Sequence, residues 1–144
     1  MNLEYSEEYQ AFRAEVRAFL AEHWTQADID AAPPADPTAT AFGMVTRNDA
    51  RATRFRTAAI ERGYLYRHIP RVYGGGEQPP DPLAGAIIYD EFKRARAPHE
   101  LMGQGPSMLA PTLVEHGTEA QKQQFVRDTL LGTIRWCQGY REPG

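Results

Sequence analysis

The chain of 144 residues carries a formal net charge of −3, and 42% of its residues are hydrophobic, which is typical of one globular domain with a core. Its mild acidity argues against a nucleic-acid-binding surface, and no apolar run approaches the roughly 20 residues that a membrane-spanning helix needs. The single cysteine, Cys137, excludes an internal disulfide and favours a reducing compartment. Because the N-terminus lacks a signal-peptide pattern, we expect a cytoplasmic protein.

The first predicted helix begins after Ser6, a good N-cap, and two glutamates follow at the positive end of the helix dipole. Apolar residues then recur at the spacing of one helical face: Tyr5, Tyr9, Phe12, Val16, Phe19 and Leu20. We expect this face to pack in the core, because burial is the commoner use of an aromatic stripe. Arg13 and Arg17 fall largely off the stripe.

Residues 25–46 break the helical pattern, because they contain three prolines among small and polar residues. We expect a long connection here, longer than most loops between helices. It is either a mobile surface loop or a segment that packs on a missing partner. Its acidic side chains, Asp28 and Asp30, are expected to be solvated.

A second helix is predicted from an N-cap at Asn48 to Arg62, with Gly63 as the C-terminal glycine. Its apolar face is narrow, and four arginines make it basic: Arg51, Arg54, Arg56 and Arg62. We expect these arginines to form an exposed face, and a phosphate or CoA contact is the alternative. The triple glycine at residues 74–76 is expected to be a flexible turn, because neither a strand nor a lysine frames it as a phosphate loop.

Asp81 opens a third helix as its N-cap, followed by proline at the first helical position, and Pro98 is expected to end it. The C-terminal half of this helix is polar and includes Glu91. A fourth helical piece is predicted over about residues 107–116, with a kink or an irregular first turn because Pro111 lies inside it. Three adaptable apolar residues near its start are expected to fill the core: Met102, Met108 and Leu109.

Thr118 and Gln121 form a capping box for a fifth helix, which Gly132 is expected to end. Aromatic and β-branched residues then favour an extended segment over residues 133–144, with four side chains on one face: Ile134, Trp136, Gln138 and Tyr140. A strand needs partners for its backbone groups, and no clear second strand precedes it. We therefore expect an unpaired first strand, which is mobile or pairs with another molecule.

Three stretches of the sequence form a set: Pro70-x-x-Tyr-Gly-Gly75, His116-Gly-Thr-Glu-Ala-Gln-Lys122 and Trp136-Cys-Gln-Gly-Tyr-Arg-Glu-Pro-Gly144. In this order and spacing they resemble the acyl-CoA dehydrogenase family over roughly residues 60–144. The last stretch is similar to the family's flavin-contacting segment, with Arg141 where the family has serine or threonine. The resemblance implies an all-α fold: a bundle of about five helices over residues 1–132, like the family's N-terminal domain, before residues 133–144 start a middle β-domain.

The resemblance also implies an FAD-dependent enzyme that dehydrogenates an acyl-CoA thioester between its α and β carbons and passes the hydride to the flavin. By matching positions, three residues would approach the flavin: Gln138, Tyr140 and Arg141. Three others would line the acyl-chain pocket, which is the alternative to core packing: Met102, Met108 and Leu109. The family's catalytic glutamate belongs to a C-terminal bundle, so we expect no catalytic residue in this chain, and we expect the chain alone to be inactive and not to retain FAD. The full-length protein would be a homo-oligomer.

The residues by themselves show no catalytic or metal-binding set, since the four histidines are scattered without ligand spacing. A non-enzymatic function therefore stays open beside the enzymatic one. It is that of a helical module that associates with a complete dehydrogenase subunit or with another protein.

Overall fold

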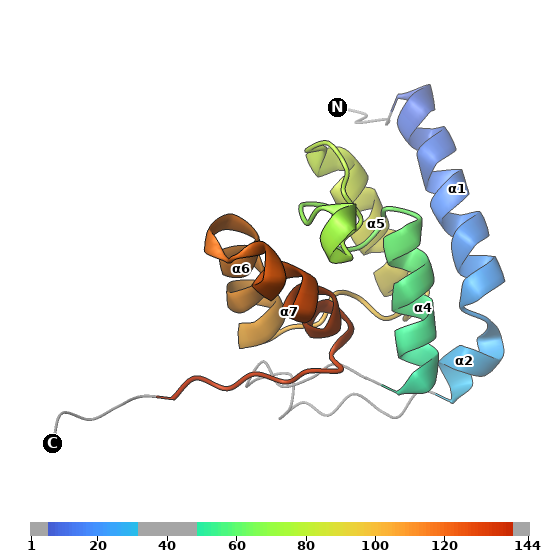
Figure 1. Cartoon of the computed structure of the whole chain (residues 1–144). Coiled ribbons are helices and arrows are strands. Elements are labelled where there is room, and N and C mark those ends of the chain that lie inside the picture. Colours follow the sequence, from blue (N-terminus) through green and yellow to red (C-terminus); the bar gives the residue numbers. More distant parts are fainter. Residues whose placement is uncertain (1–5, 32–48, 140–144) are drawn as a thin grey trace, which may run out of the picture.

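The computed structural model describes residues 6–31 and 49–139, and in these ranges the chain is helical with no strand (Figure 1). The elements in chain order are α1 (Glu7–His23), α2 (Gln26–Asp30), α4 (Ala50–Glu61), the 3-10 turn η1 (Arg71–Tyr73), α5 (Pro82–Arg94), the π-turn η2 (Gly105–Leu109), α6 (Ala110–His116) and α7 (Glu119–Leu131). The all-α fold is confirmed, with six α-helices in the described residues against the five or so that the sequence suggests. An unpaired extended segment follows α7 as far as residue 139, as expected.

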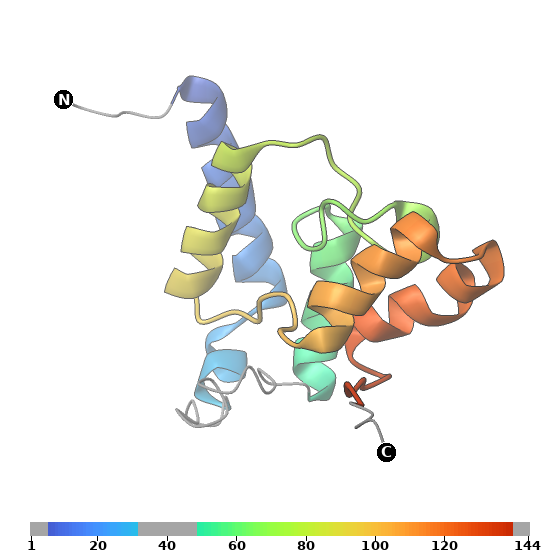
Figure 2. The same cartoon turned by 90° about the vertical axis from the view of Figure 1, so that its left-hand side faces the viewer.

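Helix α4 lies between two helix pairs, as the views in Figure 1 and Figure 2 agree. On one side α1 packs along α5, and on the other α6 pairs with α7, which also contacts α4. The core between them is aromatic, because the ring centroid of Phe55 lies 5.7 Å from that of Phe19 and 5.3 Å from that of Phe92. Tyr64 meets Phe19 edge to face at 5.1 Å, which is a favourable aromatic geometry.

Helix α1 begins and packs as its sequence predicts. The Ser6 side chain accepts a hydrogen bond from the backbone N–H of Tyr9, so Ser6 is the N-cap. Four members of the apolar stripe lie in the core, buried or half-buried: Phe12, Val16, Phe19 and Leu20. Tyr9 is half-buried outside that cluster, and its hydroxyl donates to the Asp81 carboxylate at 3.3 Å. Tyr5, the first predicted member of the stripe, lies outside the described residues.

The polar edge of α1 makes a contact with α5 that the helical pattern does not reveal. Arg13 Nη1 donates to Glu91 Oε1 at 2.6 Å, and Arg17 Nε donates to Glu91 Oε2 at 2.9 Å. The Glu91 side chain is only 2% exposed, although it lies in the polar half of its helix. Hydrogen bonds from Arg17 and Arg13 lower the pKa of Glu91 against the opposing effect of burial. The two arginines therefore join α1 to α5 through a buried carboxylate.

The expectation that residues 25–46 form one long loop is wrong at its start, where the chain forms α2. Asp28 caps this helix, because its Oδ2 accepts from the Thr25 backbone N–H at 3.0 Å and from the Thr25 hydroxyl at 2.8 Å. Asp28 is therefore buried rather than solvated, whereas Asp30 is exposed as expected. Residues 32–48 lie outside the described residues.

The N-cap of α4 is Asp49, whose carboxylate accepts from the Ala52 N–H at 2.8 Å, and the expected cap Asn48 lies outside the described residues. The C-terminal glycine is confirmed, since Gly63 has a φ of +85°. The exposed arginine face is confirmed for three members: Arg51, Arg54 and Arg62. It is wrong for Arg56, which is fully buried.

The glycine-rich segment after α4 is packed rather than a flexible turn. Four of its side chains belong to the core: Tyr64, Leu65, Tyr66 and Ile69. A side chain on Gly75 or Gly76 would collide with the carbonyl oxygen of Ile69 or Leu65, so these glycines permit close approach of two stretches of backbone.

The remaining predicted helix ends agree with the structure, except that α5 ends earlier than predicted. The Asp81 carboxylate caps α5, whose last residue, Arg94, lies four residues before Pro98, so the helix ends earlier than the proline requires. Thr118 and Gln121 form the predicted capping box of α7, which ends at Gly132 in the left-handed conformation. In the part of the chain that the structure describes, no helix is long and apolar enough to cross a membrane.

Candidate functional site

The loop between α5 and η2 carries Met102, and core side chains hold this loop in place. Arg56 Nε donates to the carbonyl oxygen of His99 at 2.7 Å, which gives the buried guanidinium a backbone acceptor. The His99 ring packs on Phe92 with centroids 5.8 Å apart, and burial and the nearby charge of Arg56 lower its pKa. Leu101 is buried, whereas the next residue, Met102, is 61% exposed. The loop is therefore anchored directly beside the side chain that it exposes.

Tyr66 ties the same loop to the end of α7. Its buried hydroxyl accepts from the Leu101 N–H at 2.8 Å and donates to the Leu130 carbonyl oxygen at 2.9 Å. Burial raises the pKa of Tyr66, so the hydroxyl keeps the proton that it donates. The backbone N–H of Tyr66 donates to the carboxylate of Glu100 in the loop. Two hydrogen bonds of one side chain thus set the distance between the loop and α7.

The irregular turn expected near Pro111 is confirmed as the π-turn η2. The N–H of Ala110 donates to the carbonyl of Gly105, five residues back. Pro111 cannot donate a backbone hydrogen bond, and its ring would clash with a carbonyl one helical turn earlier, which explains the wider turn. The turn leaves Met108 57% exposed and Leu109 half-buried.

The exposure of Met102 and Met108 contradicts the expectation that they fill the core. Thioether side chains are flexible and polarizable, and they adapt to apolar groups of varied shape. A contiguous patch of exposed apolar groups marks a contact surface for a ligand or another part of a protein. The two methionines therefore meet the first condition for the predicted acyl-chain contact.

The tail after α7 leaves the helix in a defined direction. The N–H groups of Thr133 and Ile134 both donate to the carbonyl of Asp128, at 3.0 and 3.2 Å. The indole Nε1 of Trp136 then donates to Thr129 Oγ1 at 2.8 Å, and the ring meets Phe125 edge to face at 5.6 Å. Trp136 is still 37% exposed.

The structure brings the predicted flavin segment and the predicted substrate segment together. Gln104 Nε2, just before the π-turn, donates to Gln138 Oε1 at 3.1 Å. One residue later, Gly105 lies directly against Trp136. The sequence shows no periodicity that would place residues 104 and 138 side by side, because the contact depends on how α6 and α7 pair.

Gln138 and Trp136 suit one edge of a flat heteroaromatic group such as a flavin. A carboxamide can both donate and accept hydrogen bonds, and an indole offers an aromatic surface. Thioethers, amides and indoles do not exchange protons near neutral pH, so these side chains are suited to binding and orienting a ligand and not to acid–base catalysis. The other two predicted flavin contacts, Tyr140 and Arg141, lie outside the described residues.

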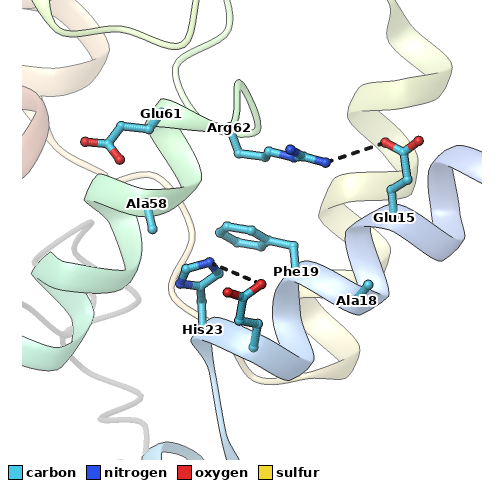
Figure 3. A pocket seen from close by; sticks show the side chains of 8 residues that line it. Glu15, Ala18, Phe19, His23, Ala58, Glu61 and Arg62 are labelled. Atoms are coloured by element: carbon cyan, nitrogen blue, oxygen red, sulfur yellow. Dashed lines mark ion pairs between the residues drawn. The ribbon is translucent and has the colours of Figure 1, made fainter.

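A hollow of about 440 Å³ lies between α1 and α4 (Figure 3). Its lining combines three glutamates with an arginine, a histidine and a small apolar floor: Glu15, Ala18, Phe19, Glu22, His23, Ala58, Glu61 and Arg62. Its ion pairs are long, 4.0 Å for Arg62 with Glu15 and 3.8 Å for His23 with Glu22, and such exposed pairs stabilise little. None of the predicted site residues lies in this hollow. Within the described ranges, no group of histidines, cysteines and carboxylates could hold a metal ion.

Comparison with known proteins identifies the family to which this domain is similar. The family described as the acyl-CoA dehydrogenase N-terminal domain matches residues 6–133. The acyl-CoA dehydrogenase AFT10-1 of Alternaria alternata is 29% identical over 151 aligned positions, which cover 99% of this chain and 33% of that protein. FadE34 of Mycobacterium tuberculosis is 36% identical over 62% of this chain and 12% of its own length. IpdE1 of Mycolicibacterium smegmatis is 46% identical over 39% of this chain and 14% of its own length.

The chain thus spans a third or less of the length of these relatives, each of which is named an acyl-CoA dehydrogenase. No solved structure was found to match it. The domain match covers all of the described helices, including the capping box of α7 and the packed segment after α4. The chain therefore belongs to the acyl-CoA dehydrogenase family, and residues 6–133 correspond to its N-terminal helical domain.

Proposed function

We propose that this chain supplies one wall of the substrate site of an FAD-dependent acyl-CoA dehydrogenase. In this proposal Met102, Met108 and Leu109 contact the acyl chain, and Gln138 contacts the flavin edge. One observation carries the proposal: the segment that exposes Met102 and Met108 is joined to the tail by the 3.1 Å hydrogen bond from Gln104 to Gln138. Substrate and cofactor must lie side by side for a hydride to pass between them, and the contact supports this arrangement because Gln104 lies in the chain between Met102 and Met108.

The flavin would supply the hydride acceptor, and this chain's residues would orient it and exclude water. Tyr140 and Arg141 are proposed as further flavin contacts that follow Gln138 in the chain. We propose that the full-length enzyme is a homo-oligomer and that its catalytic base lies outside this chain. The isolated chain should therefore neither retain FAD through purification nor oxidise acyl-CoA with an artificial electron acceptor, because a hydride acceptor reacts only in a preorganised pocket.

The acyl-chain contact can be tested directly by methyl NMR of the chain labelled with ¹³C at its methionine methyl groups. We expect a medium-chain acyl-CoA to shift the Met102 and Met108 signals, assigned by Met102→Leu and Met108→Leu, while free CoA leaves them in place. Val72→Ala is the matched control, since Val72 is an apolar side chain that is 64% exposed on η1, outside this surface. Equal shifts with free CoA, or none with acyl-CoA, would contradict the proposal.

The alternative, a non-catalytic module that binds another protein, is favoured by exposed apolar side chains elsewhere. Leu83 and Tyr89 are 48% and 56% exposed, and both lie on α5 rather than on the loop and π-turn that carry Met102 and Met108. If the function is protein binding alone, a captured partner should protect α5 from hydrogen exchange while acyl-CoA leaves the methionine signals unchanged.

A further inference from the structure

We propose that Trp136 is a positioning residue that holds the tail against the π-turn, so that Gln138 keeps a fixed place relative to Met108. The role of this position in flavin binding rests on the proposed function, whereas the contacts of Trp136 do not depend on it. Three residues form the seat of the indole: Gly105, Phe125 and Thr129.

Gly105 allows the indole to lie directly on the π-turn. A Cβ at this position would be 2.7 Å from Trp136 Cδ1 and 3.1 Å from Thr129 Cγ2, both closer than ordinary van der Waals contact. Gly105 is buried, and its neighbours come from the turn, α7 and the tail. The absence of a side chain here serves the approach of the indole and of α7.

Thr129 sets the orientation of the indole. Its hydroxyl donates to the Phe125 carbonyl oxygen at 2.7 Å, so its proton is committed and its oxygen accepts the indole N–H at 2.8 Å. An indole N–H can only donate, and a hydroxyl oxygen whose own proton points away is its matching partner. Thr129 is fully buried on α7, so this acceptor has a fixed position.

The tail is held at two points that lie on the same side of an extended chain. Trp136 and Gln138 are two residues apart and therefore point the same way, whereas Cys137 between them points the other way. Trp136 contacts Gly105 and Gln138 contacts Gln104, so neighbouring residues before and in the π-turn receive alternate residues of the tail. A slip of the tail by one residue would break both contacts at once, which makes this register well defined.

The test uses the indole N–H signals of the two tryptophans in ¹⁵N NMR spectra of the whole chain, with Trp136→Phe for assignment. We expect the Trp136 N–H to be protected from exchange in the unmodified chain. Thr129→Val should abolish this protection and Thr129→Ser should retain it, because only serine keeps the hydroxyl acceptor. A role in packing alone predicts the opposite order, since valine preserves the volume of threonine and serine does not.

Gly105→Ala is the second variant, and we expect it to displace the indole and to shift the backbone amide signals of residues 136–138. Cys137→Ser is the matched control, because Cys137 is exposed between the two contacts. Circular dichroism of each variant establishes that the helices are intact. An unprotected Trp136 N–H in the unmodified chain would overturn the inference, and so would Thr129→Val with protection unchanged.

Comparing the Met108 methyl signal with the protection of the Trp136 N–H distinguishes failure of this inference from failure of the proposed function. If acyl-CoA leaves the Met108 methyl signal unchanged while the Trp136 N–H follows the serine-over-valine order, the proposed substrate contact fails and the positioning of the tail stands. If Met108 responds to acyl-CoA while the Trp136 N–H is unprotected in the unmodified chain, the proposed substrate contact stands and the inference on Trp136 is overturned.

Discussion

Replacing Tyr66 by phenylalanine tests whether one buried hydroxyl organises the loop between α5 and η2. The ring is 1% exposed, and phenylalanine keeps its packing and the backbone conformation while removing the oxygen. Two groups then lose their partner, the Leu101 N–H at 2.8 Å and the Leu130 carbonyl at 2.9 Å. Each buried polar group left without a hydrogen bond costs about 1–3 kcal/mol, and removal of the buried hydroxyl offsets part of this, so we expect a loss of about 2–4 kcal/mol.

The assay is urea unfolding followed by far-ultraviolet circular dichroism, in which the midpoint falls while the denaturant dependence stays unchanged. Tyr73→Phe is the control, since its hydroxyl bonds to Glu119 at 2.8 Å on the exposed surface and its loss should cost less than about 0.5 kcal/mol. Hydrogen exchange should show lost protection at the Leu101 amide in Tyr66→Phe. A change in the free energy of unfolding no larger than that of the control would refute the reasoning.

Two further outcomes follow from the packing of α1 and α5. The free energy of unfolding should decrease as the pH is lowered, in two windows: below 6.5 for His99, which is buried beside Arg56, and below 4.5 for Glu91. The reason is that both groups have a lowered pKa in the folded state and therefore bind protons more readily in the unfolded state. Glu91→Gln should remove only the lower window, and a lower window that persists in this variant would contradict the assignment. Phe12→Ala should cost about 1–3 kcal/mol in urea unfolding, less than the roughly 3–5 kcal/mol of a fully buried phenylalanine, because Phe12 is only half-buried; a loss below about 0.5 kcal/mol would show that α1 is not docked through this ring.

The helix boundaries were largely determined by the sequence itself, because caps and breakers act within a few residues. The Asp81 N-cap, the Thr118 capping box and the terminal Gly132 are all where the sequence indicates them. The same holds for the irregular turn at Pro111, since a proline removes a helical hydrogen bond wherever it lies. The apolar stripe of α1 is equally local, because its period belongs to one helix.

Whether the polar side chains are buried or exposed was decided only by the tertiary structure. Arg56 and Glu91 look like surface residues of polar helical segments, yet both are buried, because their partners lie 43 and up to 78 residues away in the chain. No local pattern reports an acceptor at that separation. Asp28 differs because its partner, Thr25, is only three residues away, but the sequence pattern did not predict α2, the short helix that this capping box begins.

The candidate site shows the same division. Its residue types were readable from the sequence, since the methionines and the tail form recognisable stretches, and their order agrees with the family. Their exposure and their meeting were not, because the contact of Gln104 with Gln138 and of Gly105 with Trp136 needs α6 and α7 to pair and Tyr66 to hold the loop. A sequence determines which groups can bind; the distances between groups on different elements arise only when the helices pack.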